Sequence, residues 1–246
     1  MEDQLAQSEL DELWRFDDPM ASAERFAMAA AEPRRSEVVR AELETQRARA
    51  LGLQARFEEA EALLESLEPA QGRLQIRILL ERGRLRNTEG RPEEAIPLFE
   101  EALALARREE ETFLAVDAAH MLAIADPGRS EQWTEEAFAD LAATSDHRTW
   151  RWAVVLHNNR GWALFEAREP SAALAEFERA LEAAERFGTA DQRFAARWSL
   201  ARCLRELGQL DAATALQRRL AEERPDDPDV AAELASLTDG TPTIES

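Results

Sequence analysis

The strongest constraint on the fold is an internal repeat. Residues 82–106 (RGRLRNTEGRPEEAIPLFEEALALA) align without a gap on residues 160–184 (RGWALFEAREPSAALAEFERALEAA). In both segments a glycine is followed twelve residues later by alanine, four residues after that by phenylalanine, and then by an Ala-Leu pair. Spacings of three and four place these residues on one face of a helix. The repetition therefore predicts a series of similar helical units that stack along the chain.

Further copies extend the repeat in both directions. Residues 47–69 and 200–225 follow the same pattern with alanine in place of the glycine, and residues 112–144 predict a helix, a break and a second helix. The equivalent alanines lie 35, 42, 36 and 40 residues apart: Ala60, Ala95, Ala137, Ala173 and Ala213. Turn-forming residues fall at 89–92, 169–171 and 207–209. Each copy is therefore predicted to be two helices joined by a short loop.

The composition agrees with a helical chain and excludes several classes of function. Tyrosine is absent, and only 9 glycines and 10 prolines are available for turns, so strands are disfavoured. A net charge of −20 disfavours nucleic acid, whose phosphates need a basic surface. No apolar run approaches the ~20 residues that span a bilayer, so no membrane association is expected. The start does not resemble a secretory signal, and the single Cys203 excludes an internal disulfide, which together predict a cytoplasmic protein.

The repeat pattern resembles the tetratricopeptide repeat (TPR), a unit of ~34 residues that forms two antiparallel helices. The resemblance implies an all-α fold: a right-handed TPR superhelix of about six antiparallel helix pairs with a C-terminal capping helix. Residues 1–238 are then a single solenoid with approximate repeats 1–32, 33–69, 70–109, 110–145, 146–187 and 188–225 and a cap at 226–238. Residues 239–246 are expected to form a flexible tail.

The whole layout is also similar to a group of stand-alone bacterial TPR proteins. The stretches that carry this similarity are WRFDDPMAS (14–22), DAAHMLAI (117–124), NNRGW (158–162) and ARWSLARCLRELG (196–208). No enzymatic activity is carried over from that group, and the chain has no phosphate-loop, dinucleotide or nucleophile-elbow pattern. We therefore expect a non-enzyme without cofactor or metal that binds a protein or peptide.

Arginines gather in three windows that are expected to form first helices of the pairs. The windows 73–91, 148–168 and 189–207 hold 14 arginines and 5 acidic residues, whereas the rest of the chain holds 16 arginines and 45 acidic residues. In TPR superhelices the first helices line the concave groove, so such a groove is expected to attract an acidic partner. The arginines proposed to supply this charge are Arg84, Arg197, Arg202 and Arg205. Alternatively, the arginines pair with glutamates of neighbouring repeats.

Two of the three asparagines in the chain stand side by side, Asn158 and Asn159. Asparagine is a poor residue for a helix interior because its amide competes for backbone groups. Peptide-binding TPR domains place an asparagine just before the small residue of a first helix, and Asn159 holds that position here. The resemblance implies that Asn158 and Asn159 hold the main chain of a partner, while Trp162 and Trp198 pack on its side chains. The alternatives are that Asn159 bonds an adjacent helix and that the tryptophans fill the core.

Asp117 and His120 stand one helical turn apart, so a hydrogen bond between them could set the imidazole tautomer. Both are expected to line the wall of the groove. The other two histidines, His147 and His157, fall in a different helix pair, which disfavours a metal site. The TPR class that clamps acidic chaperone tails is also disfavoured, because Asp117 occupies a position that does not belong to that clamp.

The sequence thus predicts a non-catalytic scaffold that recognises an extended or acidic segment of a protein or peptide in an arginine- and asparagine-lined groove. Two alternatives stay open. The protein could be a structural or regulatory adaptor that acts through an acidic convex face or through self-association as a homodimer. It could also be a small-ligand sensor or enzyme that uses Asp117 and His120.

Overall fold

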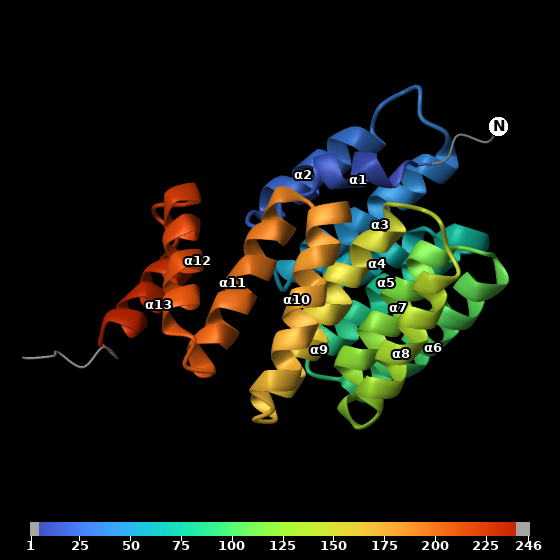
Figure 1. Cartoon of the computed structure of the whole chain (residues 1–246). Coiled ribbons are helices and arrows are strands. Elements are labelled where there is room, and N and C mark those ends of the chain that lie inside the picture. Colours follow the sequence, from blue (N-terminus) through green and yellow to red (C-terminus); the bar gives the residue numbers. More distant parts are fainter. Residues whose placement is uncertain (1–4, 240–246) are drawn as a thin grey trace, which may run out of the picture. The chain divides into compact units, whose positions relative to one another are not determined.

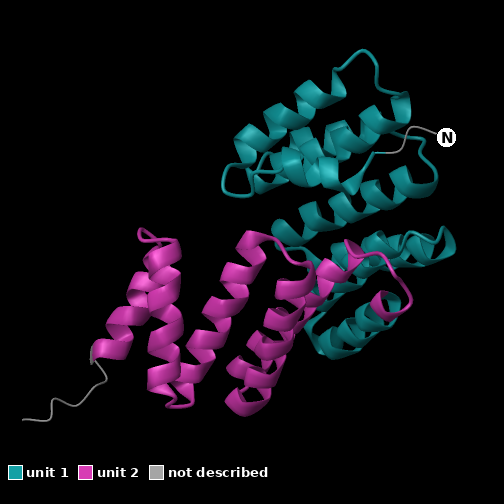
Figure 2. Cartoon of the chain, turned by 45° about the horizontal axis from the view of Figure 1, so that its top comes forward, with its two compact units in different colours: residues 1–140 teal, residues 141–246 magenta. Residues whose placement is uncertain are grey.

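The computed structural model describes residues 5–239. This part of the chain consists of thirteen α-helices and two short 3-10 helices, and it contains no strand (Figure 1). The predicted all-α fold is confirmed. Of the expected tail, residue 239 ends the last helix and residues 240–246 lie outside the described part. The chain divides into two compact units, residues 1–140 and 141–246, which Figure 2 colours separately.

In the first unit, the helices from α1 to α7 each pack against the next one along the chain. Their bounds are α1 (Gln7–Leu13), α2 (Pro19–Ala30), α3 (Glu37–Leu53), α4 (Phe57–Ser66), α5 (Gly72–Thr88), α6 (Pro92–Arg108), α7 (Thr112–Ala125), the 3-10 helix η1 (Pro127–Arg129) and α8 (Ser130–Ala142), whose last two residues belong to the second unit. Helix α5 also packs against both α3 and α7. Each of these three is the first helix of a pair, so residues from successive pairs meet on one face.

In the second unit, the helices likewise pack in chain order. Their bounds are η2 (Thr149–Arg151), α9 (Trp152–Glu166), α10 (Pro170–Phe187), α11 (Ala190–Glu206), α12 (Leu210–Glu223) and α13 (Pro228–Asp239). The two first helices, α9 and α11, contact each other, and α13 packs on both α11 and α12. Helix α13 therefore covers the end of the last pair.

The helices begin where the sequence predicts that they begin. Asp18 caps α2, because its Oδ1 accepts a hydrogen bond of 3.0 Å from the backbone N–H of Ala21. Pro19, Pro92 and Pro170 are the first residues of α2, α6 and α10. Proline suits this position because the first N–H groups of a helix have no intrahelical acceptor.

The two best-matching repeats each contain a close helix crossing. A Cβ atom added to Gly83 on α5 would clash with Cε1 of Phe99 on α6, and one added to Gly161 on α9 would lie 2.6 Å from Cε1 of Phe177 on α10. Both phenylalanines are fully buried. The absence of a side chain on the glycine therefore allows the ring to pack against the neighbouring backbone. The alanines of the repeat are all 0% exposed: Ala60, Ala95, Ala137, Ala173 and Ala213.

Candidate functional site

The sequence-predicted site residues fall into two groups. Arg84, Asp117 and His120 belong to the first unit, on α5 and α7. The remaining members belong to the second unit, on α9 and α11: Asn158, Asn159, Trp162, Arg197, Trp198, Arg202 and Arg205. Each group is described in its own unit.

In the first unit, the contacting helices α3, α5 and α7 bring together a cluster of buried charges. Arg77 on α5 donates from Nε to Oε2 of Glu42 on α3 over 3.0 Å, and both residues are at most 3% exposed. Arg84, about two helical turns further along α5, donates to Glu81 on the same helix over 2.7 Å and to Asp117 on α7. The pairing of each arginine with a carboxylate offsets the cost of removing both charges from water.

The two ends of the Arg84–Asp117 pair stabilise each other's charge. Burial acts against ionisation of both groups, but the negative charges of Asp117 and Glu81 raise the pKa of Arg84 above its usual value. Burial would likewise raise the pKa of Asp117, yet the charges of Arg84 and Arg49 hold it below the ordinary value. Arg84 is therefore engaged by two carboxylates of this chain, as the alternative of internal pairing predicted.

His120 lies beside this pair and is only 9% exposed. Burial lowers the pKa of His120 to about 4, and the positive charges of Arg84 and Arg49 act in the same direction, while Asp117 opposes them. The imidazole is consequently neutral at neutral pH. A general base works best with a pKa near the working pH, so the histidine is not tuned for that role.

Arg49 on α3 completes the cluster, and the sequence reasoning did not single it out. Its guanidinium carbon lies 5.3 Å from the ring centroid of Trp14 and 5.6 Å from that of Phe16, both in the segment between α1 and α2. The two rings stack with their centroids 4.6 Å apart. The indole N–H of Trp14 donates to Oε1 of Gln46 over 3.2 Å, which fixes the ring against α3. No carboxylate among residues 5–239 forms an ion pair with Arg49.

In the second unit, Asn158 and Asn159 lie in the middle of α9. The side chain of Asn159 is exposed and makes no hydrogen bond to any residue between 5 and 239. Asn158 is half-buried, and its Oδ1 is buried without a hydrogen-bond partner in the same part of the chain. Neither amide is thus used to fix α9 to a neighbouring helix.

The two predicted tryptophans meet on the adjoining first helices. The ring of Trp162 on α9 lies 5.9 Å from that of Trp198 on α11, and it also contacts Phe165 and Phe177 at 5.3 and 5.1 Å. Both tryptophans are half-buried, and each packs against a hydrophobic cluster of its unit. The indole nitrogen of Trp198 is buried without a partner among the described residues. The rings therefore pack on the core and also keep part of their surface exposed.

The three predicted arginines of α11 are all ion-paired within the unit. Arg202 and Arg205 both donate to Glu233 on α13, over 2.7 and 2.8 Å, and Glu233 is 6% exposed. Arg197 donates to Glu223 on α12 over 2.7 Å. These contacts attach α12 and the capping helix α13 to α11. The three guanidinium groups therefore have partners within the fold.

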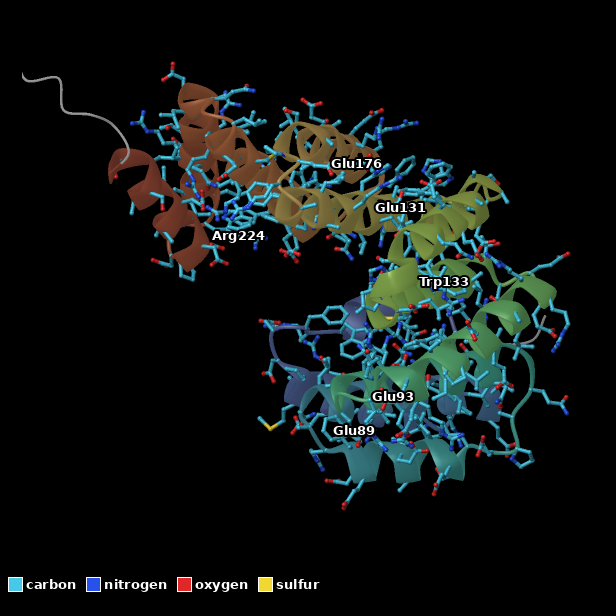
Figure 3. The ribbon with its side chains drawn as sticks, turned by 90° about the horizontal axis from the view of Figure 1, so that it is seen from below. Glu89, Glu93, Glu131, Trp133, Glu176 and Arg224 are labelled. Carbon is cyan, nitrogen blue, oxygen red and sulfur yellow. The ribbon has the colours of Figure 1, made fainter. Side chains whose placement is uncertain are left out.

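A further pair in this unit was not predicted. Nδ1 of His157 on α9 lies 2.7 Å from Oε2 of Glu176 on α10, a residue labelled in Figure 3. Glu176 is 5% exposed and also accepts a hydrogen bond from Arg179. The contact links the two helices of the pair at the residue directly before the asparagines.

Neither a metal-ion cluster nor a membrane-spanning helix occurs in the described part of the chain. No group of three or more histidine, cysteine, aspartate or glutamate side chains there could hold a metal ion. Within the same residues, no helix combines the length and the apolar character needed to cross a bilayer. Cys203 is buried, and burial raises its pKa to about 11, so the thiol is protonated at neutral pH.

Comparison with known proteins identifies the repeats. Residues 76–109 and 164–237 each match a family model described as tetratricopeptide repeat. No curated protein matches the sequence significantly. The predicted tetratricopeptide repeats are confirmed in these two segments.

Several solved structures are similar in fold. The apo form of RapI has a TM-score of 0.68 at 14% identity, over 94% of this chain and 69% of its own. BtubC (BKLC) from P. vanneervenii has a TM-score of 0.62 at 17% identity, over 94% and 95%. The apo form of the quorum sensor NprR from B. thuringiensis has a TM-score of 0.61 at 16% identity, over 90% of this chain and 64% of NprR. At these identities the likeness concerns the fold, which does not by itself determine a function.

Proposed function

We propose that this protein is a non-catalytic scaffold that binds an extended segment of a partner protein or peptide on the α9 face of its second unit. The observation that carries the proposal is the state of Asn159. Its amide is exposed and unbonded among the described residues, in the position where peptide-binding repeats carry an asparagine.

An asparagine amide offers two N–H donors and a carbonyl acceptor, which match the C=O and N–H groups of an extended main chain. A structural role for Asn159 would require a hydrogen bond to an adjacent helix, and the described residues contain none. Because asparagine also lowers helix propensity, its presence in the middle of α9 has a cost that packing does not offset. Recognition of a partner's backbone supplies a reason for it.

The neighbouring groups fit the same role. When a partner segment displaces the side chains around Asn158, the unpartnered Oδ1 accepts a hydrogen bond from a backbone N–H of that segment. Trp162 follows Asn158 by one helical turn, and with Trp198 it offers aromatic surface of the kind that dominates interface energies. Amides beside aromatic rings suit a segment that presents its main chain and apolar side chains.

The arginines support this reading rather than recognition of an acidic segment in the second unit. Arg197, Arg202 and Arg205 already share carboxylates of α12 and α13. Binding an acidic partner there would require breaking these pairs, which include the nearly buried Glu233. The specificity proposed for this face is therefore for the main chain and apolar side chains.

The pairing of the arginines also favours a second candidate function, that of an adaptor. If the paired first-helix arginines serve the fold, an acidic outer surface would be the interacting face in a chain whose total net charge is −20. Under this alternative, a partner is basic and its binding weakens steeply with salt.

The test begins with peptides selected from a random library by the wild-type protein. Their affinity is measured by calorimetry for the wild type, for Asn159→Ala and for the matched control Asn87→Ala on α5. We expect Asn159→Ala to weaken binding by about 1–3 kcal/mol, because a buried backbone group of the peptide loses its partner. The control should bind like the wild type, and the melting temperatures of all three should agree within about 2 °C.

Unchanged affinity in Asn159→Ala would contradict the proposal. Loss of the cooperative melting transition would assign the asparagine a structural role instead. If selected ligands are uniformly basic and respond to charge reversal on the second helices alone, the adaptor function is the correct one.

A further inference from the structure

Arg49 is distinct among the arginines of the first-unit cluster. Arg77 pairs with Glu42, and Arg84 pairs with both Glu81 and Asp117, whereas Arg49 has no carboxylate partner among residues 5–239. Burial and the positive charges of Arg84 and Arg77 lower the pKa of Arg49, although Glu81 and Asp117 act against this. Arg49 is half-buried and has no ion-pair partner in the described part of the chain, so its guanidinium donors are left for an anion.

Further atoms of the same cluster have no partner. Nη2 of Arg77, Nε of Arg84 and Oε2 of Glu81 are buried without a hydrogen bond among the described residues. Arg77 and Glu81 are 3% and 2% exposed. Buried donors and acceptors in folded proteins nearly always find a partner, so these atoms mark a polar face that ordered water or a ligand can complete.

The surroundings of Arg49 define how an anion can approach it. The stacked rings of Trp14 and Phe16 cover the guanidinium at cation–π distance. The N–H donors of arginine lie in the plane of the guanidinium and form a fork that matches the two oxygens of a carboxylate. With the rings supporting the group and no internal carboxylate competing, this fork is left for a ligand.

The charge balance selects between a carboxylate and a phosphate. The cluster contains three arginines and three carboxylates: Arg49, Arg77, Arg84, Glu42, Glu81 and Asp117. The cluster is therefore neutral overall, and one carboxylate beside Arg49 would give it a single excess negative charge. A phosphate dianion would place two, close to Glu81 and Asp117, and like charges in a desolvated site repel strongly.

We propose that Arg49, supported by Trp14 and Phe16, anchors a single carboxylate of a peptide ligand on the α3–α5–α7 face of the first unit. Phe16 is 62% exposed and supplies apolar surface for a side chain next to that carboxylate. Leu53, one turn along α3 from Arg49, is 51% exposed and extends this surface. The ligand is therefore an acidic residue or a chain terminus flanked by apolar residues. This site is separate from the proposed α9 face of the second unit.

The test uses the indole signal of Trp14 in nitrogen-15 NMR spectra of the full chain, assigned with a Trp14→Phe variant. Three probes are titrated: acetyl-Leu-Glu-Leu-amide, acetyl-Leu-Gln-Leu with a free C-terminus, and acetyl-Leu-Gln-Leu-amide. The first two carry a side-chain and a terminal carboxylate, respectively, and the third carries none. Inorganic phosphate is titrated alone. We expect saturable shifts with one or both carboxylate peptides and none with the neutral peptide.

Variants on α3 provide the matched comparison. Arg49→Gln is expected to weaken the response at least tenfold. Arg47→Gln, which changes an arginine already paired with Glu44, should respond like the wild type. Circular dichroism of both variants verifies that the helices are retained.

Equal shifts with the neutral peptide, or an unchanged response in Arg49→Gln, would overturn the proposal. Saturation by phosphate below the concentrations at which the peptides act would overturn the choice of a carboxylate. Because Asn159→Ala leaves α3 untouched, a failed α9 proposal leaves the Trp14 response intact, and the reverse also holds.

Discussion

The buried His120 predicts a specific dependence of stability on pH. In the unfolded chain its pKa has the ordinary value of 6.5, whereas in the folded protein burial lowers it to about 4. Between these values the unfolded state binds more protons than the folded state, so stability falls as the pH drops below 6.5. The complete difference corresponds to about 3 kcal/mol, and roughly 2 kcal/mol of it is lost between about pH 8 and about pH 5.

The contribution of His120 is isolated by comparing the wild type with His120→Gln. Urea unfolding followed by circular dichroism gives the free energy of unfolding at each pH. The charged neighbours are Asp117 on the same helix, Arg84 from α5 and Arg49 from α3. The pKa of Asp117 is held below 3.8, so its protonation falls under the measured range. The wild type should lose about 2 kcal/mol more than the variant as the pH falls to about 5.

Parallel loss of stability in the two proteins would refute the reasoning. An NMR titration that places the pKa of His120 near 6.5 in the folded wild type would also refute it, because the linkage would then vanish.

Two further predictions concern the second unit. Glu233→Ala leaves two arginines of α11 without their shared carboxylate and should lower the free energy of unfolding by about 1–3 kcal/mol, whereas Glu223→Ala, in a more exposed pair, should cost less than about 1 kcal/mol in the same urea titration. Gly161→Ala should lower the melting temperature, because a Cβ 2.6 Å from Phe177 costs about 1–3 kcal/mol through overpacking, more than the ~1 kcal/mol that alanine contributes to helix propensity. A Gly161→Ala, Phe177→Leu double variant should recover most of that loss if the clash is its cause.

The helices and their crossings were predictable because the signals are local. Pro92 and Pro170 define helix starts through their own backbone chemistry. Gly161 and Phe177 occur at a fixed spacing that only a close helix crossing explains. Each of these signals lies within one repeat, so no knowledge of distant contacts is needed to interpret it.

The state of the arginines was not predictable from their number. Arg84 meets Asp117 at a separation of 33 residues, and Arg202 meets Glu233 at 31. A count of arginines in a first helix does not show which acidic residue the next repeat places opposite each one. A groove of unpaired arginines and a set of internally paired arginines therefore have the same composition. The composition alone does not distinguish them.

The pairs nevertheless share a spacing that a repeat protein imposes. Arg77 reaches Glu42 at 35 residues, and Arg107 reaches Asp140 at 33. These separations are close to one repeat because equivalent positions on successive helix pairs lie side by side. An arginine with an acidic residue about one repeat away is thus expected to be paired.

Arg49 departs from this rule. Glu81 stands 32 residues after it, but its carboxylate pairs with Arg84, and the following residues 82–87 (RGRLRN) hold three arginines and no acidic residue. One repeat earlier stand Trp14 and Phe16, whose rings contact the guanidinium. The carboxylate that repeat spacing offers to Arg49 is therefore engaged by Arg84, and the two aromatic rings take its place at the Arg49 guanidinium. In a chain with 50 acidic residues a guanidinium without an ion pair is informative, because its donor fork is left for a ligand.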